Sequence, residues 1–328
     1  MNIAYVVTPE QPVPPPKYGG NEKQADIIVR RLVDRGHNVV LYCSPGSTCP
    51  VNKKMSAIAS MGSERNFVVD IAANLKDYDI IIDMTAHHLS GQQKDWPVIS
   101  IMTGDPHKKY PHDTVRNRVY VSKEFAAFNG YPDHPVLHNI IHEAPWNVKH
   151  DWEKKNYALF VGVIRPEKGI ELAVDACDAL GIPIKIGGPV LSRDREFWNT
   201  LKHHSCVEYL GIVDNNSEAK WKLFGEAKVF LYPITWCDAG PLAPMEALLA
   251  GTPVVGLANG GIQTDVHNGM NGYLASDSTQ FDLKTILAYE ADWTQEIIHS
   301  SIIDKVNPDN YVDDLLVLCE RVIAGETW

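Results

Sequence analysis

The segment "PVPPPKYGGNEKQADIIVRRLVDRGH", residues 12–37, decides how the fold begins. Residues 1–7 (MNIAYVV) before it are apolar in the manner of a short buried strand, and residues 22–35 carry apolar side chains at helical spacing. The prolines and the Gly19-Gly20 pair therefore join a first strand to a first helix. In an open α/β sheet this junction lies at the carboxyl edge of the strands, where ligands bind.

Strand and helix patterns alternate along the rest of the first half of the chain. Apolar runs with helices between them predict a parallel sheet that is covered on both faces. The expected strands are residues 38–43, 78–84, 97–102, 118–122 and 135–141, and the expected helices are residues 66–75 and 123–128.

The same alternation restarts after residues 143–156, which are polar, lack apolar periodicity and are interpreted as a linker. The sequence therefore predicts an α/β protein of two Rossmann-like domains, residues 1–150 and 151–307, with parallel sheets facing a central cleft. Ligand sites favour such interfaces. The expected strands of the second domain are residues 157–164, 182–188, 207–211, 228–233 and 252–257, and its expected helices are 168–180, 193–203, 216–226 and 242–250.

Composition narrows the class of protein. The net charge of −11 is uneven, since residues 1–150 carry +1 and residues 151–328 carry −12, which disfavours nucleic acid as a partner. The six cysteines form no CxxC pair, which favours a reducing compartment over a disulfide framework or a zinc ribbon. With no signal-peptide pattern and no 18-residue apolar run, we expect a soluble cytoplasmic protein.

The first loop carries neither GxGxxG nor GxxxxGK[ST], so it lacks the fingerprint of a dinucleotide site or a P-loop. Two glycines before a helix still suit an anion, although a tight turn with positive φ explains them equally well. In the second half, Arg165 and Lys168 follow a buried strand at the mouth of a helix, where both cations can face one phosphate group. A solvated surface pair is the alternative. Asp238 and Glu246 stand eight positions apart across a loop-to-helix junction.

Three segments in order resemble the retaining glycosyltransferases of the GT-B fold, glycosyltransferase family 4. "PPPKYGGNE" resembles the PPxYGGtE loop of that family, "VGVIRPEKGIELAVDA" its VGRxxxxKGxxxxxxA segment, and "DAGPLAPMEALLAGTPVV" its E-x7-E block. The resemblance covers nearly the whole chain. It also implies that the amphipathic helix 308–328 packs back on the first domain.

The resemblance assigns roles to particular residues. It implies that Arg165 and Lys168 bind the diphosphate of the donor, that Glu246 binds the ribose hydroxyls, and that Asp238 contacts the transferred sugar. The nucleobase pocket corresponds to residues 187–190 and 211–213. The expected donor-binding residues are Gly19, Gly20, Gly188, Val190, Ile212, Gly240 and Leu242.

Some positions depart from the family pattern. Thr103-Gly104 replaces a frequent His-Gly pair, with His107 four residues after Thr103, and Thr264 stands where a glutamate is usual. Glu22, Thr103 and His107 are the candidates for the sugar or acceptor side. The departures leave open which sugar is used and whether the chain has lost turnover.

The resemblance implies front-face transfer of a hexose, with retention, from a nucleoside-diphosphate sugar to an acceptor hydroxyl. Arg165, Lys168 and the amides at the start of helix 242–250 can stabilise the leaving diphosphate, so neither a metal nor a cofactor is expected. A nucleotide-sugar epimerase of the same fold and a non-catalytic nucleotide-sugar-binding protein remain alternatives. The acceptor can be a glycan, a lipid-linked sugar or a small molecule, and the near-neutral first domain argues against membrane docking.

Histidines give a weak signal for metal. His134, His138 and His142 have a spacing of four, but Pro135 opposes a helix that would align them. His87 and His88 follow an expected strand, where a loop or capping role is favoured over a ligand role.

Overall fold

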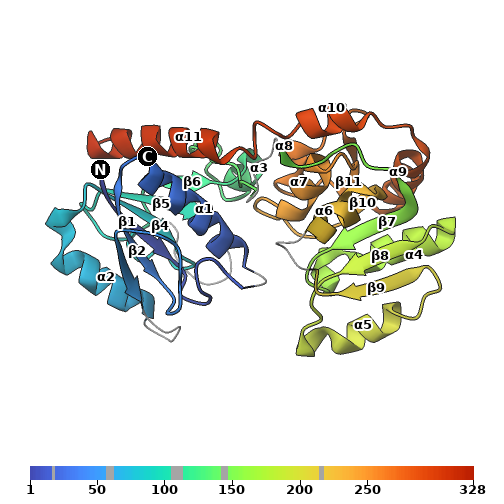
Figure 1. The fold of residues 1–328 in the computed structure, drawn as a ribbon, viewed down its shortest axis with the longest axis horizontal. Coiled ribbons are helices and arrows are strands. Elements are labelled where there is room, and N and C mark those ends of the chain that lie inside the picture. The colour runs from blue at the N-terminus through green and yellow to red at the C-terminus, as the bar shows by residue number, and fades with distance from the viewer. Residues whose placement is uncertain (17–18, 57–62, 105–113, 142–146, 214–217) are drawn as a thin grey trace. The chain divides into compact units, whose positions relative to one another are not determined.

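The computed structural model describes residues 1–16, 19–56, 63–104, 114–141, 147–213 and 218–328. The chain divides into two compact units, the first formed by Met1–His142 with Asn307–Trp328 and the second by Glu143–Val306. Each unit contains one six-stranded sheet, and every pairing in both sheets is parallel (Figure 1). The α/β fold predicted from the alternating pattern is confirmed.

The first sheet places the first strand of the chain at its centre. From edge to edge its strands are β3 (Lys53–Ser56), β2 (Asn38–Cys43), β1 (Asn2–Val7), β4 (Ile80–Met84), β5 (Val98–Met102) and β6 (Arg118–Tyr120). The helical segments of this unit are α1 (Gly20–Asp34), α2 (Ser63–Ala73), η1 (Leu75–Asp77), α3 (Lys123–Phe128) and α11 (Pro308–Ile323).

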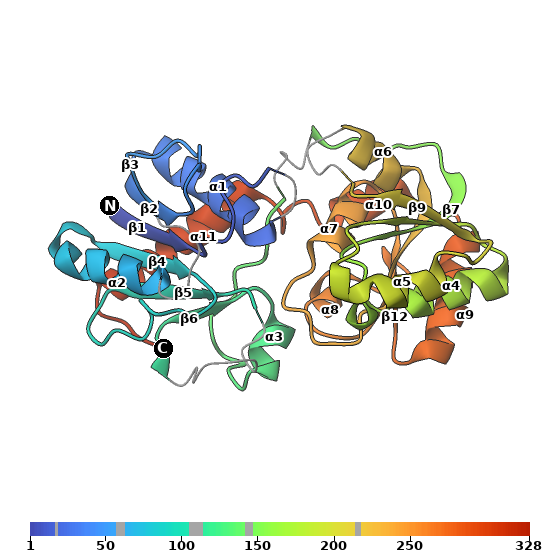
Figure 2. The same cartoon turned by 90° about the horizontal axis from the view of Figure 1, so that it is seen from below.

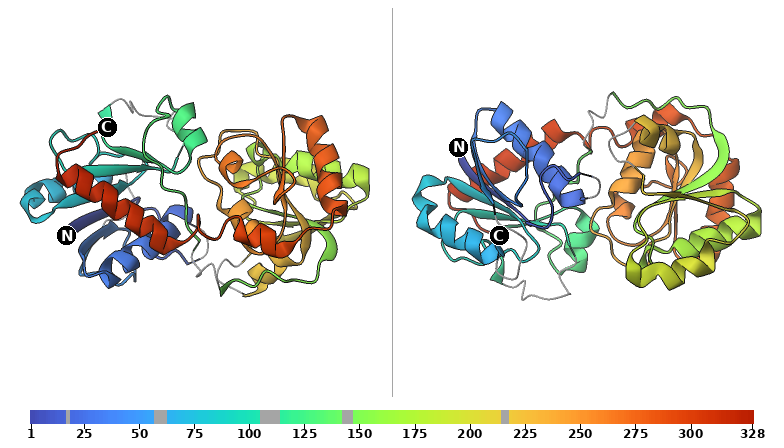
Figure 3. Two further views of the ribbon diagram at one scale, coloured as in Figure 1. Left: turned by 90° about the horizontal axis from the view of Figure 1, so that it is seen from above. Right: turned by 60° about the horizontal axis from the view of Figure 1, so that its bottom comes forward.

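Helices cover both faces of this sheet. Helix α2 packs Phe67 and Ile71 against the face that carries Ala4, Val6 and Tyr42. Helices α1 and α11 contact each other and the strands, and α11 runs along the sheet (Figure 3). Alternate side chains of one strand thus reach opposite layers, as the two-residue period of a strand requires.

Ion pairs add to the contact between α1 and α11. Arg31 Nε lies 3.2 Å from Asp309 Oδ1, and Arg35 Nη2 lies 3.1 Å from Asp313 Oδ1. These carboxylates are half-exposed or exposed, so each pair adds little stability beside the buried apolar contacts. The C-terminal helix is therefore part of the first unit.

The second sheet has the same topology. Its strands are β12 (Gly272–Ala275), β11 (Val254–Leu257), β10 (Ala227–Tyr232), β7 (Lys155–Val161), β8 (Ile184–Gly187) and β9 (Val207–Gly211). As in the first sheet, the first strand in the chain, β7, and the fourth, β10, are the two central strands. Its helical segments are η5 (Pro166–Lys168), α4 (Ile170–Leu180), η6 (Ser192–Asp194), α5 (Arg195–Leu201), α6 (Glu218–Gly225), α7 (Leu242–Leu249), α8 (Ile262–Asp265), α9 (Ser278–Glu290) and α10 (Gln295–Ser300). Helix α9 packs beside β11 and β12 (Figure 2), and its Phe281 joins the core formed with α4 and α5.

One predicted strand is wrong. In residues 135–141 only Val136 forms a bridge, to Tyr120, and the rest is irregular. The buried Gln24 side chain pairs with Ile140 instead, since Ile140 N–H donates to Gln24 Oε1 at 2.9 Å and Gln24 Nε2 donates to the Ile140 carbonyl at 2.5 Å. A side-chain amide therefore satisfies backbone groups that a neighbouring strand would otherwise have bonded.

No helix within the described residues is both long and apolar enough to cross a membrane. The six cysteines all lie in the described part of the chain and form no disulfide, and four of them are buried.

Candidate functional site

The loops after β7 and β10 come together at the carboxyl end of the second sheet. From β7 the chain proceeds through β8 and β9 to one edge, and from β10 it proceeds through β11 and β12 to the other. Neighbouring strands whose connections leave in opposite directions form the switch point of an open α/β sheet, where ligands bind. The Thr235 N–H donates to the Glu167 carbonyl at 3.2 Å and so joins the two loops.

Gly169 makes the close approach of these loops possible. Its φ is 68°, and a Cβ at this position would lie 1.7 Å from the Pro233 carbonyl oxygen. Only glycine combines a left-handed conformation with such proximity to another backbone. The glycine after Lys168 therefore fixes that lysine beside the loop that follows β10.

Lys168 belongs to a compact polar cluster. Its Nζ lies 3.1 Å from Asp238 Oδ2 and 3.3 Å from the Tyr232 hydroxyl, which itself donates to Asp238 Oδ2 at 2.5 Å. The side chains of Lys168 and Asp238 are 18% and 19% exposed. Partial burial makes this ion pair stronger than a surface pair while leaving one side of it open to a ligand.

Arg165 and Lys168 contact the same aromatic ring. Arg165 Cζ lies 4.4 Å and Lys168 Nζ 5.3 Å from the centroid of the Trp236 indole. Cation–π contacts of this kind hold both charges in place without neutralising them. Glu167, 3.8 Å from Arg165 Nε, is more than half exposed and is a weak partner. The cluster is suited to bind an anion such as a phosphate group.

A glycine segment supports Asp238 from behind. Asp238 forms a parallel bridge with Gly260, and Gly261 N–H donates to the Asp238 carbonyl at 2.8 Å. A Cβ on Gly260, which has φ 70°, would lie 2.2 Å from that same carbonyl oxygen. Thr264 follows within α8. The segment "GGIQT" thus fixes the backbone of the loop that leads through Gly240 into α7.

Helix α7 begins at Leu242, and Pro241 at its N-cap provides no side-chain hydrogen bond. The first amides of such a helix need acceptors and attract negative charge. Further along the helix, Glu246 Oε1 accepts from Lys220 Nζ at 2.8 Å, and the Glu246 side chain is 15% exposed. The structure thus brings three expected residues, Asp238, Leu242 and Glu246, onto one loop and helix.

The expected nucleobase loops lie at the ends of β8 and β9. Gly188 has φ 144° and a Cβ there would lie 1.8 Å from the Gly162 carbonyl, while Gly188 N–H donates to the Gly211 carbonyl at 2.7 Å. Val190 forms a bridge with Ile164, next to Arg165. Ile212 is 56% exposed, so an apolar side chain stands open at this edge of the sheet.

In the first unit, positive φ occurs at Gly19 (153°), which is the N-cap of α1, and Gly20 is the first helical residue. A Cβ on Gly19 would lie 2.7 Å from Glu22 Oε2. Burial raises the pKa of the Glu22 carboxyl, and repulsion from Glu10 acts in the same direction. Thr103 directly follows β5, and His107 lies outside the described residues.

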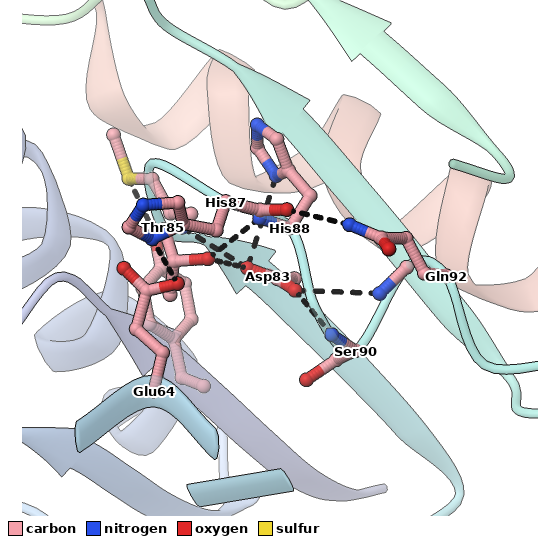
Figure 4. A network of polar contacts seen from close by, with 10 residues as sticks. Glu64, Asp83, Thr85, His87, His88, Ser90 and Gln92 are labelled. Carbon is pink, nitrogen blue, oxygen red and sulfur yellow. Dashed lines mark hydrogen bonds and ion pairs between the residues drawn. The ribbon is translucent and has the colours of Figure 1, made fainter. Parts of the chain in front are cut away.

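A buried network surrounds Asp83 at the end of β4 (Figure 4). Its Oδ1 accepts from Thr85 N–H at 3.0 Å and from Thr85 Oγ1 at 2.7 Å, and its Oδ2 accepts from Ser90 N–H at 3.0 Å. His88 N–H donates to Thr85 Oγ1 at 3.0 Å, and His87 Nδ1 lies 2.8 Å from Glu64 Oε2. The Asp83 carboxylate therefore shapes the loop that follows this strand.

Metal binding can be assessed only for the residues that the structure describes. Among them no group of three or more histidine, cysteine, aspartate or glutamate side chains is placed to hold a metal ion. His134 packs against Tyr131, with ring centroids 4.9 Å apart, and burial lowers its pKa. His142 lies outside the described residues.

Sequence reasoning missed three residues of the site: Tyr232, Trp236 and Lys220. Tyr232 ends a strand and Trp236 lies two positions before Asp238, so their proximity to that carboxylate was a usable signal. Lys220 gave none, because a lysine within a helical segment is usually solvated.

Most of the second unit is similar in sequence to a known family. Residues 144–289 match the family model "Glycosyl transferases group 1". Two proteins of Methanocaldococcus jannaschii, each described as an uncharacterized glycosyltransferase, are 28% identical over 130 and 156 residues. The matches cover 39% and 42% of this chain but only 36% and 39% of the two relatives, so little more than a third of each relative is spanned.

Solved structures match over the full length. AviGT4, a glycosyltransferase involved in avilamycin A biosynthesis, gives a TM-score of 0.77 at 21% identity, covering 100% of this chain and 99% of that one. Sucrose-phosphate synthase of Thermosynechococcus elongatus gives 0.73 at 16%, covering 99% and 100%. HepE of Anabaena in complex with UDP gives 0.72 at 15%, covering 98% and 100%. The chain has the GT-B fold, and within it residues 144–289 match the Glycosyl transferases group 1 family.

Proposed function

We propose that this chain is a retaining glycosyltransferase of family 4, which transfers a hexose from a nucleoside-diphosphate sugar to an acceptor hydroxyl. The observation that carries the proposal is the contact of Arg165 and Lys168 with one indole ring at the switch point of the second sheet. The family match over residues 144–289 and the UDP complex of HepE support the same assignment.

The chemistry requires charge stabilisation at the leaving group. When the bond between the sugar and the phosphate breaks, negative charge grows on the departing phosphate oxygen. Arg165, Lys168 and the uncapped amides at the start of α7 can stabilise that charge, and these groups are held in place by the protein itself. In the proposed front-face mechanism the departing oxygen takes the proton of the acceptor hydroxyl, so no separate base is needed.

The remaining donor contacts are proposed from the resemblance. Glu246 accepts from the ribose hydroxyls, and the nucleobase lies against the loops that contain Gly188, Val190 and Ile212. A diphosphate between Arg165 and the start of α7 would also reach the ammonium of Lys168, which is 3.1 Å from Asp238. The sugar would then lie near Asp238, as the resemblance implies.

Catalysis without a metal is part of the proposal, because two cations and a helix terminus supply the positive charge that a divalent ion would otherwise provide. Turnover should therefore be unchanged by EDTA. Loss of turnover on chelation, with recovery on adding a divalent ion, would contradict this part. The cytoplasmic location is likewise proposed, because the six cysteines form no disulfide and contain no CxxC pair, a pattern typical of proteins in a reducing compartment.

One observation favours a second candidate, a nucleotide-sugar-binding protein without turnover. The carboxylate expected to contact the transferred sugar, Asp238, is engaged by Lys168 and Tyr232. The two functions differ in what happens to a bound donor. Both predict that UDP-, GDP- or ADP-sugars raise the melting temperature, but only a transferase releases nucleoside diphosphate.

The experiment uses a panel of donors and acceptors. Thermal shift first identifies the donor, and release of free nucleoside diphosphate is then measured with and without each acceptor. Release that depends on the acceptor supports the transferase. A donor that binds but is never consumed supports the binding protein, and a chain that binds no nucleotide sugar contradicts both.

A further inference from the structure

Lys220 is a buried lysine at the candidate site. It lies on α6 and is 2% exposed. Its Nζ is 2.8 Å from Glu246 Oε1 and 4.5 Å from the centroid of the Trp221 ring. A buried ammonium is costly unless a carboxylate or other acceptors compensate it. The ion pair therefore couples α6 to the one carboxylate that α7 carries.

The ion pair uses only one oxygen of Glu246. Within the described parts of the chain, Lys220 is the sole side chain that donates to this carboxylate, and it does so at Oε1. The Glu246 side chain is 15% exposed, in contrast to the lysine that holds it. Oε2 is thus the oxygen left for a hydroxyl of a ligand.

We propose that Lys220 is the positioning residue for ribose recognition: it fixes the Glu246 carboxylate so that Oε2 accepts a hydrogen bond from a ribose hydroxyl of the donor. This inference rests on the proposed function, in which Glu246 faces the ribose. Lys220 itself does not contact the donor. It acts through the carboxylate that it orients.

Electrostatics gives the pair a second role. The donor brings a negatively charged diphosphate to the same end of α7, where an uncompensated carboxylate would repel it. With Lys220 in place the pair is neutral overall, and the carboxylate can still accept a charge-assisted hydrogen bond. A neutral glutamine at position 246 would avoid the repulsion but would bind the hydroxyl less strongly.

The test compares UDP with 2′-deoxy-UDP and 3′-deoxy-UDP by calorimetry on the full chain, or the corresponding GDP or ADP series if that base binds best. We expect the wild type to bind the parent nucleotide about tenfold or more tightly than the analogue that lacks the bonded hydroxyl. In Lys220→Met this preference should fall below about threefold, because the freed carboxylate is no longer held toward the ribose. Affinity for the deoxy analogue should fall as well, but by less than affinity for the parent, because the uncompensated carboxylate repels the diphosphate of both.

Lys154 provides a matched control. It is a second largely buried lysine of the same unit. Its Nζ donates to the carbonyl of Gly225, the last residue of α6, and to the Gly251 carbonyl and Thr252 Oγ1, which follow α7. Lys154→Met should lower the melting temperature but leave the ratio between parent and deoxy nucleotide unchanged. A change of ratio in this variant would show that the readout reports stability, and would overturn the assignment to Lys220.

The double variant Lys220→Met/Glu246→Gln covers the case in which Lys220→Met does not fold. Removing both charges avoids a lone buried charge, so this variant should melt above Lys220→Met and show the same nucleotide ratio as Glu246→Gln alone. A further loss of ratio in the double variant would contradict action through Glu246.

The outcomes separate the two claims. If the wild type binds UDP, GDP or ADP but does not distinguish the parent from either deoxy form, the ribose role of Glu246 is wrong. If the wild type distinguishes the parent from a deoxy form and Lys220→Met retains that ratio, Lys220 is only structural. The same holds if Lys220→Met binds the parent and both deoxy forms more weakly by the same factor. If no nucleoside diphosphate binds the wild type, the proposed function itself fails.

Discussion

Two glycine-bearing loops, one in each unit, differ in what holds them. A Cβ on Gly169 in the second unit would meet the backbone of Pro233, whereas a Cβ on Gly19 in the first unit would meet the side chains of Glu22 and Pro15. The charges beside the loops differ as well. Lys168 is paired with Asp238, while burial raises the pKa of the Glu22 carboxyl.

This difference indicates that the two units have different roles. In the second unit Lys168 is paired with Asp238 and the loops are fixed by contacts between backbones, so this site is preorganised for a ligand in the absence of one. The first unit keeps a buried acid whose ionisation is costly, which is typical of a functional position rather than a stabilising one. Substitutions in the two loops should therefore have different consequences.

The largest effect is expected for Gly169→Ala. The new Cβ combines a left-handed φ with a clash against the Pro233 carbonyl, and together these should cost about 3–5 kcal/mol of the free energy of unfolding. Gly181→Ala is the control. Gly169 is the N-cap of α4 and Gly181 is the C-cap of the same helix, with φ 66°, but a Cβ on Gly181 would have no atom within 4 Å. It should cost only about 1–2 kcal/mol in urea unfolding. Equal costs would show that the approach of the two loops is not tight.

The next effect concerns the paired charges. Lys168→Ala removes a cation and also leaves Asp238 facing the diphosphate, so kcat should fall by about 100-fold or more, and by more than donor affinity falls. Arg165→Ala should act in the same direction but less strongly, since Glu167 beside it is exposed.

The double variant Lys168→Ala/Asp238→Asn sharpens this point. It removes the carboxylate that Lys168→Ala leaves uncompensated, so affinity for nucleoside diphosphate in calorimetry should recover relative to the single variant. Affinity that stays as low as in Lys168→Ala would show that Asp238 does not oppose phosphate binding.

A smaller effect is expected in the first loop. In Gly19→Ala the residue would have to keep φ 153°, and its Cβ would lie 2.7 Å from Glu22 Oε2. Together these should cost about 1–3 kcal/mol locally and lower the rate of sugar transfer. Nucleoside diphosphate affinity should stay within several-fold, since the cations lie in the second unit. Gly20→Ala, at the first position of α1, should be tolerated in both assays. If Gly19→Ala kept normal turnover, Gly19 would be a turn residue only.

The smallest effect is a shift of stability with pH. Because burial raises the pKa of Glu22 above 4.5, the folded state binds more protons than the unfolded state from pH 4.5 up to the raised value, and stability falls as pH rises through that window. Glu22→Gln should therefore raise the melting temperature by roughly 1–3 °C at pH 7.5 and give no gain at pH 4. A gain of equal size at both pH values would mean that ionisation is not its source.

Local patterns in the sequence predicted most of the architecture. The buried strands β1, β4, β7 and β10 are apolar runs of the length that a covered parallel sheet needs. Strand β3 was missed because "KKMS" is largely exposed and carries two lysines, so no apolar period marks it. The error at residues 135–141 has the opposite cause, since a buried apolar segment is bonded by the Gln24 side chain rather than by a strand.

The residues of the site that lie together on one segment of the chain could be predicted from the sequence. Arg165 and Lys168 follow β7 directly, so their place at the carboxyl edge follows from the strand alone. Their contacts with Tyr232 and Trp236 depend on β10 pairing with β7, which local sequence does not encode. The ion pair between Lys220 and Glu246 likewise joins two helices through tertiary packing.

The most direct test of the central claim is calorimetric titration of UDP, GDP and ADP into the wild type and Arg165→Ala. The nucleoside diphosphate carries the full charge that develops as the sugar leaves, so it reports the proposed phosphate grip better than the intact donor does. The account predicts that the wild type binds one of the three at a single site and that Arg165→Ala binds it at least about tenfold more weakly. The same affinity in both proteins, or no binding by the wild type, would contradict it.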